Sequence, residues 1–443
     1  MVNTNVSIIK EFIQSIRFVS EDKELKTKFS LTPSCFIRER KLNFSAVSFL
    51  ILSMLKKSLN IELQNFFDKQ NETGLMPCSK SAFCQQRQKI SSNWFKFLIE
   101  YISRLFYEQD NIVKRWKGYK IISVDGSAAF LVNNKEVQNY YHGGVNQYGG
   151  YALARYMKMY DVLNGITLKA ELMPFNNSER YMSYKWVDAM HDDAITLFDR
   201  GYPAYTLFFL MQNSETPKPF VMRCKKHFTH AVKKFVYTDS TDEIITFYPD
   251  DRAIKTLYEY GVRVSHQTPV QIRAVKVLLA NGETEVLLTN LFDKRIVSLK
   301  NLAELYRMRW LIETDIGKEK NLFQLENFSS HTRNSIEQDF YANFVAANIH
   351  QLITMQANES VKRKTRKRKY IYKINTSASL AVFKKKLVQL YYTKKLKDLL
   401  LHLQNVFEQF TEPIRPDRSI PRIKKSKRRY GKHQTQTNYR NNL

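Results

Sequence analysis

The amino-acid sequence predicts a mixed α/β protein with helical regions at both ends. Short apolar runs that end in aspartate alternate with helical stretches through the middle of the chain. The 443 residues exceed one ordinary domain, and a hydrophobic content of 43% is enough for more than one core. Lysine and arginine number 70 against 42 acidic residues, for a net charge of +28.

The first region, residues 1–115, is predicted to be helical. Ser45–Lys57 has an apolar centre, Ser79–Ile90 opens with a serine suited to an N-cap, and Trp94–Tyr107 is amphipathic. Short helices joined by polar turns are typical of a DNA-binding helix-turn-helix. A small helical bundle that enters no groove has the same pattern, so both alternatives stay open.

A sheet is predicted over residues 116–219. The pattern is three strands, a helix, a strand and a second helix, followed by a further strand that opens the next region. The expected strands are Lys120–Val124, Tyr151–Val162, Ile166–Leu172, Ala194–Phe198 and Phe220–Arg223, and the expected helices are Ser178–Met190 and Tyr205–Gln212. This order predicts a mixed α/β sheet.

Residues 220–298 are predicted to be a β-rich insertion. The strongest feature is a hairpin of Ile272–Ala280 and Glu283–Leu291 around Asn281-Gly282, because a type I′ turn needs positive φ at both central residues. Further candidate strands are Phe235–Tyr237, Ile244–Tyr248 and Val262–Ser265.

The remaining chain is predicted to return to helix. Residues 299–355 contain two helices, Leu299–Leu325 and Asn334–Met355. Residues 356–443 form a basic helical region that includes the segment VKRKTRKRK at 361–369 and a helical stretch over Ala378–Phe410. The apolar residues of that helix offer a surface for dimer contact, although packing within the chain would bury them equally well. The tail from Pro413 is basic and poor in apolar residues.

The excess of positive charge predicts a polyanionic partner. Nucleic acid is favoured, because neutralised phosphates release condensed counterions. A membrane surface is the second option, but the sequence has no run of 18 apolar residues, so no spanning helix is expected. The spacing of the four cysteines fits neither a zinc knuckle nor a disulfide framework, which favours a reducing cytoplasm.

Two aspartates follow apolar strands, Asp125 after IISV and Asp199 after AITLF. Ligands of open α/β sheets usually bind at strand ends. A carboxylate there is costly unless it is solvated, paired or bound to metal. One such aspartate commonly begins a turn. Two on separate strands of one sheet indicate a shared site.

The helix predicted from Leu299 supplies the third carboxylate. Tyr306, Arg309, Glu313 and Lys320 fall within about 60° of arc on an ideal helix. A carboxylate among two cations and a phenol predicts a surface for phosphate and metal. The alternative is a solvated face with an ordinary Arg309–Glu313 pair at i, i+4.

These motifs together resemble the IS4-like DDE transposases. The similarity rests on DGS at 125–127, DRGY at 199–202 and Tyr-x2-Arg-x3-Glu-x6-Lys at 306–320, the motif called YREK. EVLLTNL at 285–291 and the basic IPRIKKSKRR near the C-terminus are also similar to the family. The resemblance covers residues 120–355 well and the N-terminal region weakly.

The resemblance implies a ribonuclease H-like core interrupted by the β-rich insertion. It implies that Asp125, Asp199 and Glu313 are catalytic and hold two Mg²⁺ or Mn²⁺ ions. It also implies a set of residues that contact DNA: Tyr306, Arg309, Lys320, Arg200 and Tyr202.

The implied activity is a DNA transposase that cleaves insertion-sequence ends and joins them to target DNA by two-metal hydrolysis and transesterification. Its partners would be double-stranded DNA of the terminal inverted repeats and the target, with a homodimer forming on DNA in the bacterial cytoplasm, at the nucleoid. Two alternatives remain. One is a ribonuclease H-like nuclease without strand transfer, and the other is a non-catalytic DNA-binding derivative.

One departure from the family concerns tryptophan. Better-studied members place a tryptophan in the β insertion, where it stacks on a flipped base beside a DNA hairpin. No tryptophan lies between residues 200 and 309 here. Candidate substitutes are Phe228, Phe235, Tyr237 and Tyr248.

Overall fold

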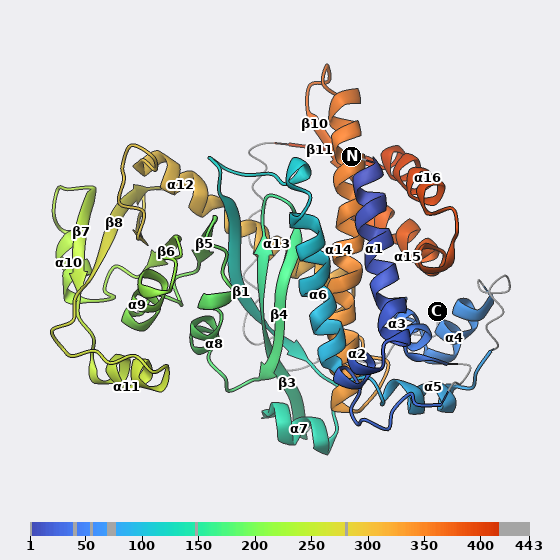
Figure 1. Cartoon of the computed structure of the whole chain (residues 1–443). Coiled ribbons are helices and arrows are strands. Elements are labelled where there is room, and N and C mark those ends of the chain that lie inside the picture. The colour runs from blue at the N-terminus through green and yellow to red at the C-terminus, as the bar shows by residue number, and fades with distance from the viewer. Residues whose placement is uncertain are drawn as a thin grey trace. The chain divides into compact units, whose positions relative to one another are not determined.

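The computed structural model describes residues 2–38, 42–53, 56–68, 77–146, 149–279 and 282–415. The chain divides into two compact units (Figure 1). We call them the helical unit, which contains Met1–Val113, Ala129–Ala154 and Lys318–Leu443, and the sheet unit, which contains Lys114–Ala128 and Arg155–Gly317.

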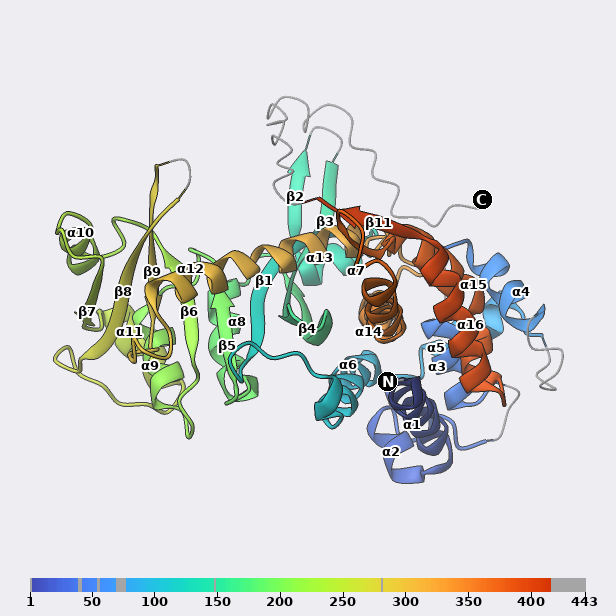
Figure 2. The same ribbon diagram turned by 90° about the horizontal axis from the view of Figure 1, so that it is seen from above.

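The helical unit is organised around α14 (Arg333–Lys364). α14 is buried on most of its circumference and contacts α6 (Ser92–Tyr107), α3 (Phe44–Leu52) and α16 (Leu396–Gln409), as Figure 2 shows. The other helices of this unit are α1 (Val2–Glu21), α2 (Lys23–Lys28), α4 (Leu59–Asp68), α5 (Lys80–Arg87), α7 (Lys135–Tyr141) and α15 (Thr376–Tyr392). Its short strands are β2 (Gly143–Asn146), β10 (Ile371–Ile374) and β11 (Thr411–Ile414).

The N-terminal and C-terminal regions that were predicted to be helical both belong to this unit. Ser79 caps α5 as predicted, since its hydroxyl accepts a hydrogen bond from the Ala82 amide at 3.2 Å. The helical region predicted over Ala378–Phe410 is confirmed, and it consists of two helices, α15 and α16. Their apolar side chains, including Phe383 and Leu403, are buried within the unit, so intramolecular packing occupies the surface expected for dimer contact. The basic tail from residue 416 lies outside the described residues.

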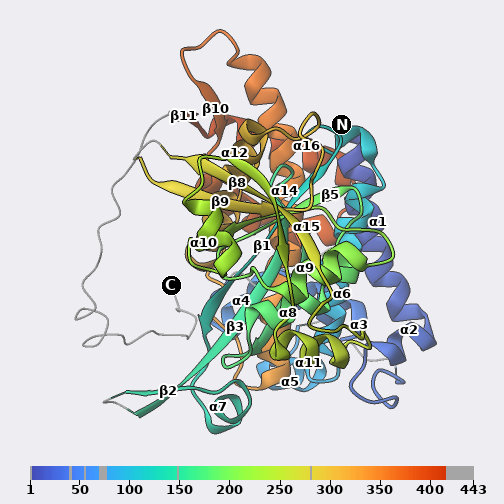
Figure 3. The same cartoon turned by 90° about the vertical axis from the view of Figure 1, so that its left-hand side faces the viewer.

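The sheet unit confirms the predicted mixed α/β class. Its strands lie in the order β4-β3-β1-β5-β6-β9-β8-β7. β1, β5 and β6 are parallel, whereas β6, β9, β8 and β7 are antiparallel. Figure 3 shows β8 and β9 side by side at the near end of the sheet. The strands are β1 (Lys120–Phe130), β3 (Gly149–Asp161), β4 (Ile166–Pro174), β5 (Ala194–Phe198), β6 (Phe220–Cys224), β7 (Asp242–Phe247), β8 (Val270–Leu278) and β9 (Thr284–Thr289).

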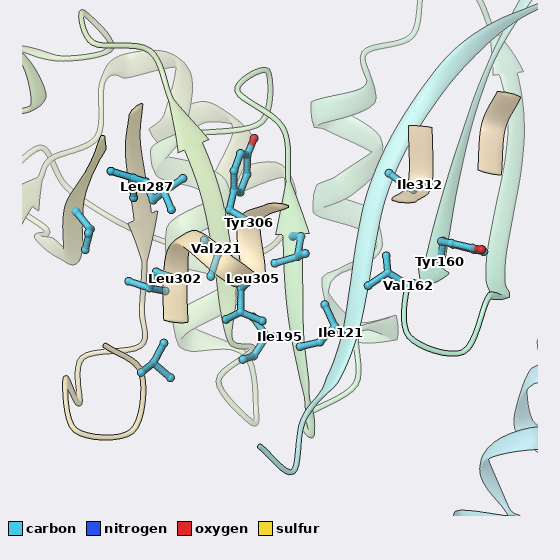
Figure 4. Close-up of a cluster of buried hydrophobic side chains, with 14 residues drawn as sticks. Ile121, Tyr160, Val162, Ile195, Val221, Leu287, Leu302, Leu305, Tyr306 and Ile312 are labelled. Atoms are coloured by element: carbon cyan, nitrogen blue, oxygen red, sulfur yellow. The ribbon is translucent and has the colours of Figure 1, made fainter. Parts of the chain in front are cut away.

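Helices cover both faces of this sheet. Figure 2 shows α12 (Leu299–Met308) on one face and α9 (Tyr205–Asn213) and α11 (Asp251–Glu259) on the other. Every residue of β5 is buried, as expected for a central parallel strand covered on both sides. Figure 4 shows Leu302 and Leu305 of α12 in the same apolar cluster as Ile195 of β5 and Val221 of β6. The other helices of the unit are α8 (Glu179–Lys185), α10 (His230–Val236) and α13 (Trp310–Asn321), which continues into the helical unit.

The predicted β-rich insertion is less regular than expected. The β8–β9 hairpin is confirmed, and Gly282 has the expected positive φ of 79°, while Asn281 lies outside the described residues. The strands predicted at Phe235–Tyr237 and Val262–Ser265 are wrong. The first is the end of α10, whose N-terminus is capped by Thr229, and the second is irregular.

No described helix is both long enough and apolar enough to cross a membrane.

Candidate active site

Asp125 and Asp199 occupy neighbouring positions on adjacent strands. β1 and β5 pair in parallel, and the last pair of their register is Val124 with Phe198. Asp125 directly follows Val124, and Asp199 directly follows Phe198. Because neighbouring strands lie roughly 4.8 Å apart, the two aspartates start from adjacent backbone positions. β5 ends before Asp199 as predicted. β1 does not end at Asp125, because it continues to Phe130; only its pairing with β5 stops there.

The residue after Asp125 must be small. The Gly126 amide donates a hydrogen bond to Asp125 Oδ1 at 2.9 Å. A Cβ atom on Gly126 would lie 2.7 Å from the Tyr156 carbonyl oxygen and 2.9 Å from Glu179 Cδ. Real Cβ atoms do not approach backbone this closely, so the glycine of the DGS motif allows β3 and the Glu179 side chain to close around the aspartate.

The long helix predicted from Leu299 to Leu325 is interrupted at Arg309. α12 ends at Met308 and α13 begins at Trp310. The Arg309 amide donates to the Tyr306 carbonyl at 3.1 Å, and the Ile312 amide donates to the Arg309 carbonyl at 3.2 Å. This three-residue spacing marks a local 3₁₀ turn, a feature often found at functional positions. The expectation of one uninterrupted helix is therefore wrong.

The Arg309 side chain lies among the candidate carboxylates. Its Nη2 donates to Glu313 Oε1 at 2.8 Å, and its Nη1 lies 3.7 Å from Asp125 Oδ2. The Tyr306 hydroxyl donates to Asp199 Oδ1 at 3.4 Å. Three separate elements, β1, the end of β5 and α13, thus bring their carboxylates to the Tyr306–Arg309 pair.

Arg309 keeps unsatisfied donors although it is buried. Only 2% of the residue is exposed, and within the described part of the chain its Nε and Nη1 atoms have no hydrogen-bond partner. The 3.7 Å separation from Asp125 allows an ion pair but not a hydrogen bond. A buried donor without an acceptor costs roughly 1–3 kcal/mol, so such a group in a folded protein indicates an absent partner.

The pKa of Asp125 is set first by burial and then by the charges around it. Burial raises the pKa of Asp125 to about 6, and the nearby Glu179 and Asp199 add to the rise. The Gly126 amide and Arg309 act in the opposite direction but do not offset it. A cation bound between these carboxylates would relieve this repulsion.

A buried ion pair anchors the helix that carries Glu313. Lys158 of β3 is fully buried, and its Nζ lies 2.5 Å from Asp315 Oδ2 on α13. Lys158 also lies 4.4 Å from the centre of the Tyr160 ring. Because Asp315 follows Glu313 by two residues, this pair fixes α13 against the sheet.

The site residues fit a divalent cation in chemical type. Carboxylate oxygens are the ligands that Mg²⁺ and Mn²⁺ prefer, and Asp125, whose pKa is raised mainly by burial, has the carboxylates of Glu179 and Asp199 nearby. In the part of the chain that the structure describes, no three His, Cys, Asp or Glu side chains are grouped to hold one metal ion. The cation nearest to Asp125 and Glu313 here is the guanidinium of Arg309.

The other predicted DNA-contacting residues have different surroundings. Arg200 is exposed, whereas only 3% of Tyr202 is exposed and its hydroxyl donates to Glu179 Oε2 at 3.3 Å. Lys320 belongs to the helical unit, where its Nζ lies 3.6 Å from Glu326 Oε1. The structure therefore brings Tyr306 and Arg309 to the carboxylates, but Lys320 lies in the other unit.

Sequence reasoning missed Glu179. The pattern indicated only that a helix starts near Ser178, where an acidic residue in the first turn is ordinary. Nothing in the local sequence shows that this side chain faces Gly126 and Tyr202, because both contacts come from distant strands.

The aromatic side chains predicted as candidates for base stacking differ in how much of each is exposed to solvent. Tyr237 and Tyr248 are 74% and 60% exposed, whereas Phe235 is 2% exposed. Phe228 packs against Phe247 with ring centres 6.1 Å apart. Exposure therefore leaves Tyr237 and Tyr248 as the available rings of that set.

Comparison with known families identifies the class. A model of the transposase DDE domain matches residues 116–349, more than half of the 443-residue chain, and the chain belongs to this family. The match contains the sheet strands and the α12–α13 segment, and with them Asp125, Asp199 and Glu313.

Individual relatives are distant. The Escherichia coli (strain K12) protein named "Putative transposase InsZ" is 23% identical over 133 residues, which is 29% of this chain and 44% of the relative. This chain thus spans less than half of that relative's length. A cryo-EM structure of the piggyBac transposase synaptic complex with hairpin DNA covers 96% of this chain and 88% of its own, at 10% identity and a TM-score of 0.43.

Proposed function

We propose that this DNA transposase cleaves the ends of an insertion sequence and joins them to target DNA, with Asp125, Asp199 and Glu313 as the metal-binding catalytic residues. One observation carries the proposal. Three carboxylates from separate elements surround a buried arginine with free donors, inside the region that matches the transposase family.

The strand order supports a ribonuclease H-like core. Three consecutive strands β1, β3 and β4 lie on one side of the sheet, and β5 and β6 follow β1 on the other. The insertion adds β7, β8 and β9 beyond β6 before the chain returns as α12 and α13. In this arrangement Asp125 lies on β1 and Asp199 directly follows the adjacent central strand β5.

Each side chain has a proposed task. Asp125, Asp199 and Glu313 would hold Mg²⁺ or Mn²⁺, which supply Lewis-acid activation of the nucleophile and stabilisation of the leaving oxygen. Arg309 would donate its free Nε and Nη1 hydrogens to a DNA phosphate, an acceptor well matched to a guanidinium. Tyr306 holds Asp199 in place through its hydroxyl. Arg200 and Lys320 would add contacts to the DNA backbone.

Neutralising Asp125 tests the catalytic assignment. Asp125→Asn should abolish nicking of a duplex that carries the element's terminal repeat, while repeat binding changes little, because only the ligand charge is lost. Nicking and gel-shift assays measure the two effects. Asp188→Asn, at an exposed position of the same unit, is the matched control. Normal cleavage by Asp125→Asn would remove Asp125 from the catalytic set.

A second assay separates the proposed activity from its alternatives. Precleaved repeat ends with free 3′-hydroxyls should be joined to a target plasmid in the presence of Mg²⁺ or Mn²⁺. Cleavage without joining would indicate a nuclease, and binding without either reaction would indicate a DNA-binding derivative.

We also propose that the chain acts as a homodimer on DNA. Joining two ends to one target requires two active sites in one complex. The net charge of +28 opposes association of free protomers, and bound DNA would neutralise it. Light scattering with and without the terminal-repeat duplex should show a 2:2 complex only in the presence of DNA.

A further inference from the structure

Glu179 is a fourth carboxylate beside the proposed metal-binding residues. It is the first residue of α8, and its side chain is 25% exposed. It packs so closely on Gly126 that a methyl group there would lie 2.9 Å from Glu179 Cδ. Because Gly126 follows Asp125 directly, Glu179 contacts the backbone of the first catalytic strand.

The same side chain contacts the turn that carries Asp199. The buried Tyr202 hydroxyl donates to Glu179 Oε2 at 3.3 Å. The next residue of α8, Arg180, donates from Nε and Nη2 to the Gly201 carbonyl at 3.0 and 2.6 Å. Two successive residues at the N-terminal end of α8, Glu179 and Arg180, therefore form hydrogen bonds with the turn after Asp199.

One cation partly balances this carboxylate. Arg155 of β3 donates from Nη1 to Glu179 Oε1 at 2.7 Å and from Nε to the Phe175 carbonyl at 3.3 Å. Arg155 and Glu179 keep 29% and 25% of their side chains exposed, so solvent and ions reach the pair from one side. Glu179 is thus shared between Arg155 and the carboxylate site.

We infer that Glu179 is a positioning residue of the active site, which holds the Asp199 turn through Tyr202 and adds negative charge that strengthens divalent-cation binding. The inference rests on the proposed function, because it assigns Glu179 to the same cation site. A purely structural role would require only the hydrogen bonds and not the charge.

Two substitutions that change the charge of the site in opposite directions distinguish the electrostatic role of Glu179 from a purely structural one. Glu179→Gln keeps the size and an acceptor for Tyr202 but removes the charge, so the Kd for Mn²⁺ should rise about tenfold. Arg155→Gln removes the balancing cation, so the Kd should fall. General structural damage would weaken binding in both variants.

The measurement is calorimetric titration of the full-length protein with Mn²⁺ in the absence of DNA, so it does not depend on catalysis. Glu215→Gln, in an exposed loop of the same unit, controls for the loss of one negative charge. Tyr202→Phe keeps the charge of Glu179 and should leave the Kd within twofold while lowering kcat for nicking, with KM for DNA unchanged.

The outcomes are distinct. Wild-type binding of Mn²⁺ with equal Kd values for Glu179→Gln and Glu215→Gln overturns the inference and leaves the proposed function standing. Failure of the wild type itself to bind Mn²⁺ counts against both. If circular dichroism shows that Glu179→Gln is unfolded, Arg155→Gln decides: tighter binding supports the inference, and unchanged or weaker binding overturns it.

Discussion

The two units each bury an arginine, and the two arginines differ in what surrounds them. Arg87 of the helical unit is fully buried, and Arg309 of the sheet unit is 2% exposed. Arg87 donates to Gln338 at 2.9 Å, to Ser329 at 2.6 Å, and to Asp339 at 3.0 Å. A further bond reaches the Ser335 carbonyl at 3.1 Å.

Arg309 lacks this saturation. Its Nη2 donates to Glu313 Oε1, and Nε and Nη1 have no acceptor among the residues that the structure describes. A protein stabilises a buried guanidinium by surrounding it with acceptors, as at Arg87. Where acceptors are missing, the donors are available to a ligand. The contrast separates an arginine saturated by acceptors within the fold from the arginine that we propose contacts DNA.

The largest expected effect is on the stability of the helical unit. Arg87→Met leaves Asp339 buried without its cationic partner, so the free energy of unfolding should fall by about 3–5 kcal/mol. Urea denaturation followed by circular dichroism measures the change. Arg295→Met, which breaks an exposed pair with Asp293, should have little effect. Equal effects of the two substitutions would show that the buried Arg87 network stabilises the fold no more than an exposed ion pair does.

A smaller effect on stability and a large effect on activity are expected at Arg309. Arg309→Gln should change the free energy of unfolding by about 1 kcal/mol or less, because the loss of the bond to Glu313 is offset by the removal of unsatisfied buried donors. Nicking of the terminal repeat should fall about 100-fold, and the salt dependence of binding should decrease by the equivalent of about one phosphate contact. Arg307→Gln, exposed on α12, is the matched control. A loss of stability as large as that of Arg87→Met would make Arg309 a structural residue.

The smallest expected effect concerns the pH dependence of stability. His350 of α14 is buried, and its Nε2 lies 3.0 Å from the Ser379 hydroxyl. Burial, with Lys318 and Lys384 nearby, lowers the pKa of His350 to about 3. The unfolded chain therefore takes up a proton that the folded protein excludes, and stability is lost as the pH falls below about 6.5.

Between pH 7 and 5.5 this loss should amount to about 1 kcal/mol in the free energy of unfolding. His350→Gln should flatten the dependence in urea denaturation across that range, and His266→Gln, at an exposed position, should leave it unchanged. A slope that survives His350→Gln would assign the titration to another group.

The sequence predicted the elements that local pattern determines. Apolar runs located β1 and β5, the Asn-Gly pair located the β8–β9 hairpin, and Ser79 located the start of α5. The strand predicted at Phe235–Tyr237 was wrong because a Thr229 cap and the packing of Val232 and Phe235 favour helix there. Tertiary packing of this kind is not visible in a short window of sequence.

The candidate site was predictable to a similar extent. Spacing and resemblance selected Asp125, Asp199 and Glu313, but neither showed the helix break at Arg309 or the contacts of Glu179. Both features depend on long-range contacts, such as Lys158 with Asp315 across 157 residues. The placement of Tyr306 on the same helix face as Glu313 and Lys320 was an extrapolation from an unbroken helix, and the break at Arg309 separates Tyr306 on α12 from the other two on α13.

The network around Arg87 also has a consequence for how the protein is made. Arg87 bonds to Gln338, 251 residues further along the chain, and the sheet unit is encoded almost wholly between them. At ribosomal rates of roughly 5–20 residues per second, the N-terminal helices wait about 10–50 s for their partners to be synthesised. The residues of the sheet unit, with its carboxylates, are all synthesised before Gln338. The apolar faces of the N-terminal helices therefore stay exposed on the nascent chain until α14 is synthesised. During this period chaperone binding to α3 and α6 would protect the chain most.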